Sequence, residues 1–236
     1  MTATAAAFSD STSPVVDIEA TRRRLSARQA EAVATLVRAA EEETEEVGYA
    51  GLTVRGVAKR AGVAPATAYT YFSSKDHLLA EVFWRRMEAL DPVDTDESVP
   101  MAARIEQTVR DMIPFAAERP ALIDACTVAM ISPSLDVAHL RDRIGALTHR
   151  RLTAAVGPDV DPLVVRVLEA SYSGALLAAG TGHRSFLDIP VFLAEAAALL
   201  VDGASSHNGT SQSSTSQSAS KKRTTVQSTP ANGDRR

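Results

Sequence analysis

Hydrophobic residues in the first third of the chain recur with the three- and four-residue spacing of amphipathic helices. Ser26 and Gln29 have the spacing of a capping box, which satisfies free amides at the start of a helix. The apolar positions after them predict a helix that ends at Gly48, because glycine readily adopts the left-handed conformation that follows a last helical turn. A second, shorter helix is predicted from an N-cap at Thr53 to a stop at Gly62.

A third short helix is predicted from Pro65 to Tyr71, since proline is favoured at the first helical position. So little chain separates it from the second helix that the two must meet at a sharp angle. A fourth helix is predicted from a capping box of Ser73 and Asp76 to a stop before Pro92.

The segment 91–100 is acidic, flanked by proline and aperiodic, which is typical of a loop at a domain boundary. Beyond it, helical spacing recurs and no strand pattern does, and Pro114 is expected to kink the first of these helices. The chain is therefore expected to be all-α. Residues 1–21 are expected to form a disordered arm and residues 204–236 a disordered polar tail, because neither has an apolar face to bury.

The composition, 236 residues of which 45% are hydrophobic, is enough for a globular core. No long apolar run or signal-peptide pattern occurs, so a cytoplasmic location without a membrane partner is expected. The net charge of −4 is uneven, because residues 22–86 carry +3 and residues 87–204 carry −8. This front is basic although five acids gather at 41–46, a run expected on the outward face of the first helix. A basic front and an acidic body are expected of a protein whose front faces nucleic-acid phosphates.

The two short helices joined by a glycine turn predict a helix-turn-helix, whose second helix can lie in the major groove of DNA. The residues of that helix are small or hydrogen-bonding and uncharged, so it can approach base edges closely. Around it stand basic residues placed for phosphates or guanine edges: Arg55, Lys59, Arg60 and Lys75. The alternative is an ordinary helical hairpin with a solvated basic face.

The run from Gly62 to Lys75, together with Gly48-Tyr49, Leu52-Thr53-Val54 and Val57-Ala58, resembles the signature of the TetR family of bacterial transcriptional regulators. The resemblance covers residues 26–90. It implies an all-helical homodimer with an N-terminal three-helix DNA-binding domain, here 22–74, and a C-terminal helical ligand-binding and dimerisation domain, here 75–203.

The resemblance also implies a set of DNA contacts. The matching positions of this chain are Thr53, Arg55, Pro65, Ala66, Thr67, Tyr69, Thr70, Tyr71 and Lys75. Thr53, Tyr71 and Lys75 stand at phosphate positions, and the others stand at base positions. Tyr69 has an alternative role, in which its ring packs under the helix and only its hydroxyl reaches DNA. Ala68 departs from the family pattern, where a larger apolar residue such as leucine is usual.

Apolar residues on the central predicted helices form a second candidate site. They are Met112, Phe115, Leu122, Cys126, Met130, Tyr172 and Leu176. A pocket there would accept an apolar or amphipathic effector, such as a lipid, a sterol-like compound or an acyl thioester, with Tyr172 as a polar handle. The alternative is that these side chains only fill the core.

The segment 189–201 is apolar almost all round, so a helix there needs neighbours on several sides. Together with the small-residue helix around Gly174, it predicts an interface of four helices between two copies of the chain. The alternative is a helix buried within one chain.

No metal, cofactor or enzymatic activity is expected. Asp136, His139 and Asp142 share a helix face, but no paired-histidine motif accompanies them. Cys126 is expected to be a small core residue, with redox sensing as the alternative. No nucleophile, base and orienting group stand together in recognisable spacing.

The sequence therefore predicts a ligand-responsive transcriptional repressor. It is expected to bind double-stranded operator DNA as a homodimer and to be released by a small apolar or amphipathic molecule. The alternative is a helical protein–protein adaptor that uses the same fold without specific DNA binding.

Overall fold

The computed structural model describes residues 27–113 and 115–203. All the elements assigned in these ranges are helices, so the predicted all-α class is confirmed. The expected arm at 1–21, the Ser26 cap and the expected tail at 204–236 lie outside the described residues.

The elements follow one another without a strand among the described residues. They are α2 (Ala27–Gly51), α3 (Val54–Arg60), α4 (Pro65–Tyr71), α5 (Lys75–Glu88), α6 (Met101–Asp111), α7 (Pro120–Met130), α8 (Leu135–Val156), α9 (Pro162–Gly180) and the 3₁₀ turn η1 (Phe186–Asp188). A last helix covers 189–203.

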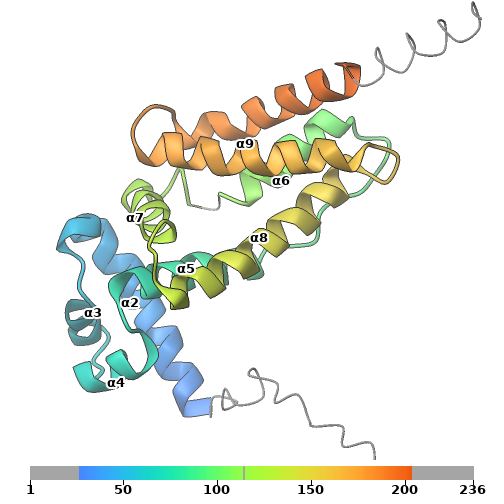
Figure 1. Cartoon of the computed structure of the whole chain (residues 1–236). Helices are drawn as coiled ribbons and strands as arrows, with labels where there is room; N and C mark the ends of the chain where they lie inside the picture. The colour runs from blue at the N-terminus through green and yellow to red at the C-terminus, as the bar shows by residue number, and fades with distance from the viewer. Residues whose placement is uncertain (1–26, 114, 204–236) are drawn as a thin grey trace, which may run out of the picture.

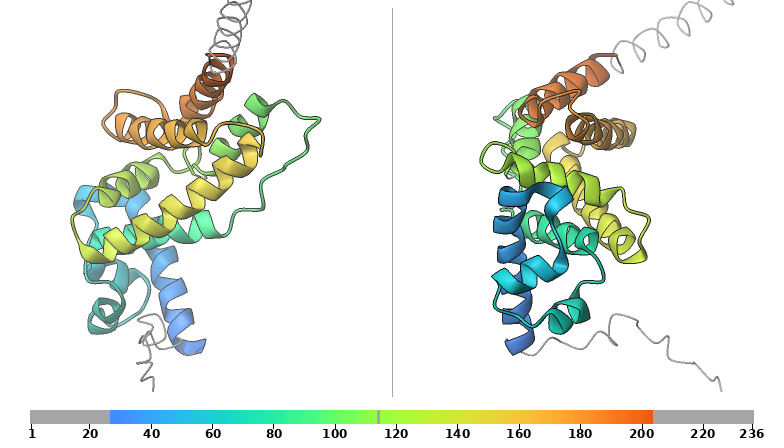
Figure 2. Two further views of the ribbon diagram at one scale, coloured as in Figure 1. Left: turned by 45° about the vertical axis from the view of Figure 1, so that its right-hand side comes forward. Right: turned by 90° about the vertical axis from the view of Figure 1, so that its left-hand side faces the viewer.

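The short helices α3 and α4 lie at one end of the molecule, and α9 lies toward the other end (Figure 1). Both views in Figure 2 agree with this separation. Helix α5 lies between the ends and packs on α2, α7 and α8. The buried hydrophobic residues form one continuous core from α2 to the last helix. Because α5 contributes to both ends, the division of the chain at residues 74 and 75 stays a prediction.

The boundaries of the front helices follow the local signals in the sequence. The Thr53 hydroxyl accepts a hydrogen bond from the Gly56 amide at 3.0 Å and caps α3. Gly48 adopts a φ angle of 64° and kinks α2, so the helix end predicted at Gly48 corresponds to a kink three residues before the end of α2. Gly62 adopts a φ angle of 66°, a region that favours glycine, and turns the chain after α3. Helix α4 occupies the residues predicted for it.

The predicted capping box at the start of α5 is wrong. Ser74, not Ser73, is the N-cap, and its hydroxyl accepts from the His77 amide at 3.1 Å. Adjacent serines carry the same capping chemistry, so only the backbone path decides between them. Ser73 instead donates to a carboxylate oxygen of Asp136 at the start of α8, at 2.7 Å.

The predicted helix that continues through Pro114 with a kink is also wrong. Helix α6 ends at Asp111, and residues 115–118 form turns. The reason is local, since proline disfavours the helical conformation of the residue before it and cannot donate a backbone hydrogen bond.

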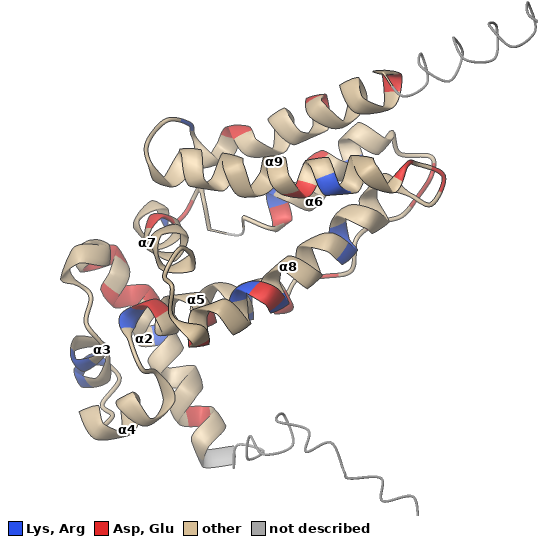
Figure 3. Cartoon of the chain, in the orientation of Figure 1, with Lys and Arg blue, Asp and Glu red and all other residues tan. Residues whose placement is uncertain are grey.

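The expectation that the acid run 41–46 faces outward is correct for Glu42 and Glu46, which are exposed, and wrong for Glu41. The Glu41 side chain is only 7% exposed. It accepts a hydrogen bond from Arg86 Nε of α5 at 2.9 Å and lies 3.4 Å from Arg119 Nη1, just before α7. Figure 3 shows the acidic residues on the part of α2 near α5 and α7. The two guanidinium groups therefore compensate a buried carboxylate that joins three segments of the chain.

Glu45 makes a second contact between α2 and α7. Its carboxylate accepts from the Leu122 amide at 2.8 Å, in the first turn of α7. The residue before that helix, Arg119, provides no side-chain cap of its own. A carboxylate from α2 thus satisfies one free amide of α7 and lies at the positive end of its dipole.

Helix α9 is long and apolar enough to cross a membrane, judged by length and composition alone. In this fold its Val164, Leu168 and Tyr172 are buried in the core. Only 33% of its most apolar stretch is buried, and Leu163 and Leu177 are exposed, so packing within one chain accounts for part of this composition.

We expect Glu41→Ala to lower the free energy of unfolding by about 1–3 kcal/mol, because two cations lose a buried partner. Glu42→Ala is the matched control. Glu42 is 52% exposed and its carboxylate lies 3.8 Å from Arg60, so its removal should cost less than about 0.5 kcal/mol. Urea unfolding measures both, and equal effects of the two substitutions would contradict the assignment of Glu41 as a structural centre.

Candidate functional site

Helix α4 presents an exposed face of small and hydrogen-bonding residues. Of the residues predicted to contact bases, those exposed on this helix are Pro65, Ala66, Thr67, Tyr69 and Thr70. Tyr69 is 53% exposed, so its ring does not pack beneath the helix as the alternative required. The face has no charged side chain and presents the hydroxyl groups of Thr67 and Tyr69 to base edges, whereas the Thr70 hydroxyl donates to the Ala66 carbonyl at 3.0 Å.

Ala68 forms the inward side of α4. It is fully buried, and α4 packs on α3 and α2. Its small side chain is therefore part of the packing, although larger residues are usual at this position in the family that the sequence resembles. Tyr71 is half-buried and packs against the core.

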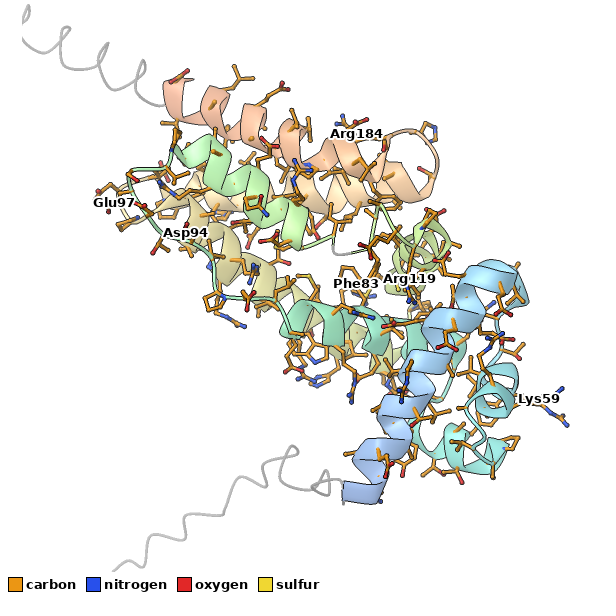
Figure 4. All side chains as sticks on the ribbon, turned by 180° about the vertical axis from the view of Figure 1, so that it is seen from behind. Lys59, Phe83, Asp94, Glu97, Arg119 and Arg184 are labelled. Carbon is orange, nitrogen blue, oxygen red and sulfur yellow. The ribbon has the colours of Figure 1, made fainter. Side chains whose placement is uncertain are left out.

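Two basic residues of α3 remain available to DNA. Arg55 and Lys59 are exposed, and Figure 4 shows Lys59 pointing away from the body. Thr53 is exposed at the N-terminus of α3 while its hydroxyl caps that helix. These residues lie on or next to α3, which packs against α4, so contacts to phosphates and to neighbouring base edges from α3 would flank a helix in the major groove.

The other two predicted basic residues already have partners within the chain. Lys75 Nζ donates to the Tyr49 carbonyl at 2.7 Å and lies 3.9 Å from the centroid of the Tyr49 ring. Arg60 Nε donates to Glu43 at 2.6 Å, and its Nη2 group pairs with Glu46. Hydrogen bonds to Glu46 and Glu43 raise the pKa of Arg60. Arg60 thus fixes α3 against α2 and has less free charge for DNA than its exposed position implies.

A cavity of about 490 Å³ lies between α7, α8 and α9 and is partly open to solvent. We call it the cleft. Its lining consists of Phe83, Cys126, Thr127, Met130, Ile131, Arg141, Ile144, Gly145, Thr148, Glu169, Tyr172, Ser173, Leu176 and Leu177. The volume lies within the range of small-molecule sites, and the lining is mainly apolar.

Four of the seven residues predicted to contact a ligand line the cleft: Cys126, Met130, Tyr172 and Leu176. The other three, Met112, Phe115 and Leu122, are buried in the core and do not line it. The pattern of the sequence therefore identified the inward faces but not the part of them that borders an unfilled volume. Ligand contact by either group stays a prediction.

Sequence reasoning missed the contribution of α8 to the cleft. Arg141, Gly145 and Thr148 occupy one side of that helix at intervals of four and three residues. The signal was a stripe of polar and small residues inside an otherwise apolar helix pattern. Arg141 Nη1 donates to the carbonyls of Met130 at 2.6 Å and Ser132 at 3.1 Å, so it also holds the loop between α7 and α8.

Two titratable groups in the cleft are neutral. Burial raises the pKa of the Cys126 thiol, whose Sγ lies 3.5 Å from the Leu79 carbonyl. Burial also raises the pKa of Tyr172, whose hydroxyl donates to the Met112 carbonyl at 3.1 Å. A protonated thiol is a poor nucleophile, which disfavours redox sensing, and the tyrosine hydroxyl is already used as a donor.

Metal binding finds no support among residues 27–113 and 115–203, where no group of three or more His, Cys, Asp or Glu side chains is arranged to hold an ion. Asp136, which the sequence places on a face with His139, instead accepts the hydrogen bond from Ser73.

Known proteins match a large part of this chain. Residues 36–82 match the family model of bacterial regulatory proteins, tetR family. An uncharacterized HTH-type transcriptional regulator of Mycobacterium tuberculosis is 46% identical over 161 residues, covering 67% of this chain and 75% of the relative. The HTH-type transcriptional repressor KstR of Rhodococcus jostii is 32% identical, covering 60% of this chain and 69% of the relative.

Solved structures agree on the fold. The crystal structure of a TetR transcriptional regulator from Rhodococcus sp. RHA1 aligns with a TM-score of 0.59 at 24% identity, covering 74% of this chain and 97% of the other. The helix-turn-helix geometry, the family model and the identity to these regulators lead to one assignment: the chain belongs to the TetR family of bacterial transcriptional regulators.

Proposed function

We propose that this regulator, which is not an enzyme, is a repressor that binds operator DNA in the cytoplasm. The observation that carries the proposal is the exposed, uncharged face of α4, flanked by the exposed cations of α3. The repressor role is supported by the relative KstR, which is itself named a repressor.

An apolar or amphipathic molecule in the cleft is proposed to lower the affinity for DNA. The C-terminal half of α7 lines the cleft, and the start of α7 is held by Glu41 and Glu45 of α2. The middle of α8 also lines the cleft, and its first turn holds Ser73, two residues beyond α4. An occupant that favours another position of α7 or α8 therefore favours another position of the DNA-binding helices.

The acting unit is proposed to be a homodimer. An apolar stripe, defined here as Leu163, Leu177, Leu187, Val191 and Leu199, is exposed on α9, η1 and the last helix. Leu199 alone is 74% exposed. Exposed apolar residues on three consecutive elements support an interface there, because a contiguous apolar surface of this kind favours contact with a partner over contact with water. Two linked copies would present two α4 helices to the two halves of a symmetric operator.

Specific reading by α4 and its neighbours predicts different effects at two basic residues. Arg55→Ala should cost about 1–3 kcal/mol of operator binding and relax the preference at one base pair in each half-site. Lys59→Ala should weaken binding to all sequences and reduce the salt dependence by about one phosphate contact. Fluorescence anisotropy with operator and scrambled duplexes at several salt concentrations separates the two effects. If Arg55→Ala weakened both duplexes equally, base reading at this position would be wrong, and absence of operator preference in the unmodified protein would favour the adaptor.

The dimer proposal predicts that Leu199→Glu yields monomers with reduced operator affinity, because a charge enters an apolar contact. The matched control is Leu135→Glu. Leu135 is 87% exposed at the start of α8, outside the stripe, so this change should leave the dimer intact. Light scattering at micromolar concentration gives the mass of each variant. A monomeric unmodified protein, or equal dissociation of both variants, would count against this interface.

A further inference from the structure

We propose that the cleft selects an elongated amphipathic molecule with an anionic group at one end and a hydroxyl group at the other. The inference rests on the proposed function, since it assigns the chemistry of the effector that this regulator would bind. Three polar side chains that the apolar lining does not explain carry it: Thr148, Arg141 and Glu169.

Thr148 supplies a hydroxyl group that has no hydrogen-bond partner among the described residues. Threonines within helices commonly donate to the carbonyl four residues earlier, as Thr44 and Thr127 do here at 2.6 Å and 2.9 Å. The Thr148 hydroxyl has no such bond, although the residue is only 6% exposed and lines the cleft. Among the described residues, the side-chain atoms that are both fully enclosed and without a partner are His139 Nε2 and Arg151 Nε, so the Thr148 oxygen is not fully enclosed. The Thr148 oxygen is therefore reachable from the cleft, and a buried polar group of this kind favours a ligand that pairs with it.

Glu169 of α9 lines the cleft together with Thr148 of α8 and limits what can bind there. Its carboxylate is 2.7 Å from Nδ1 of His149, the residue after Thr148, so the two polar groups lie at the same level of α8 and α9. A carboxylate repels an anion and accepts from a hydroxyl. A ligand hydroxyl satisfies both sides, because it donates to Glu169 and accepts from Thr148.

Arg141 supplies the opposite charge. It precedes Thr148 by seven residues on the same side of α8, which separates the two along the helix axis by about 10 Å at the rise of an α-helix. Its Nη1 group holds two loop carbonyls, while the guanidinium has further donors at Nε and Nη2. Those donors suit a carboxylate or phosphate oxygen.

Apolar side chains make up most of the remaining lining. Phe83, Cys126, Met130 and Leu176 come from α5, α7 and α9 and offer no charge to the middle of an occupant. A hydrocarbon body about 10 Å long, with the anion toward Arg141 and the hydroxyl toward Thr148, therefore matches the polar groups at the two ends of this stretch of α8.

The test uses the full-length protein and three medium-chain probes of matched length: an ω-hydroxy fatty acid, the parent fatty acid and the corresponding α,ω-diol. Calorimetry should find the hydroxy acid bound about tenfold more tightly than the parent acid, the worth of one hydrogen bond to a buried partner. Thr148→Val should abolish that preference without weakening the parent acid. Thr127→Val is the matched control, because the Thr127 hydroxyl borders the same cleft but already donates to Ile123.

The anionic end is tested with Arg141→Gln, which should weaken both acids and leave the diol unchanged. The diol also reports whether that variant remains folded, and Arg141→Lys, which keeps the charge, should retain the preference for acids over the diol. Equal affinities for all three probes, or a preference that survives Thr148→Val, would overturn the assignment of the two ends. Operator release is measured separately: a probe that binds with the predicted preference but leaves DNA bound would reject the proposed function and keep this inference.

Discussion

The buried carboxylate of Glu41 is the interaction on which the arrangement of the two ends of the molecule depends. It lies on α2, the helix that supports α3 and α4, and it meets Arg86 of α5 and Arg119 beside α7. A carboxylate removed from water needs compensating charge, so these segments cannot separate without exposing or isolating it. The neighbouring Glu45 extends the same constraint to the first turn of α7. The negative charge of this acid run disfavours DNA binding, yet two of its members, Glu41 and Glu45, connect the DNA-binding helices to the helices that line the cleft.

This connection explains how a molecule in the cleft can act at a distance without a special pathway. Helices α7 and α8 are rigid elements that contribute both to the lining and to contacts with the DNA-binding end. A ligand needs only to prefer one of two arrangements of these helices, and couplings of about 1–3 kcal/mol are typical of such systems. Arg141 is central to this account, because it lines the cleft and holds the loop that joins the two helices.

The sequence was sufficient to predict a helix where the signal for its start and end lies in neighbouring residues. The N-cap Thr53, the turn glycine Gly62 and the opening proline Pro65 specify α3 and α4 by backbone chemistry alone, and the structure has these helices where they were predicted. The choice between Ser73 and Ser74 as the cap of α5 failed, because the two residues differ only in the backbone path that tertiary packing imposes.

Features that depend on contacts between distant parts of the chain could not be predicted from a single sequence. Nothing near Glu41 indicates that Arg119, 78 residues away, will bury it. Met112 and Cys126 show the same helical periodicity, yet the first fills the core and the second borders the cleft. Periodicity identifies which side of a helix faces inward, whereas an unfilled volume results from how several helices diverge.

The most direct test of the account fills the cleft without any ligand. Gly145 lines the cleft, and a Cβ atom placed on it meets nothing within 4 Å, so Gly145→Phe would add a ring there without a clash at its Cβ. Ala146→Phe is the control, because that exposed neighbour on α8 does not line the cleft. Operator affinity of the folded dimers, measured by fluorescence anisotropy, should fall about 5- to 150-fold for Gly145→Phe and stay unchanged for the control. The coupling of the cleft to DNA would be contradicted if the Gly145→Phe protein no longer bound apolar probes but still bound the operator with unchanged affinity.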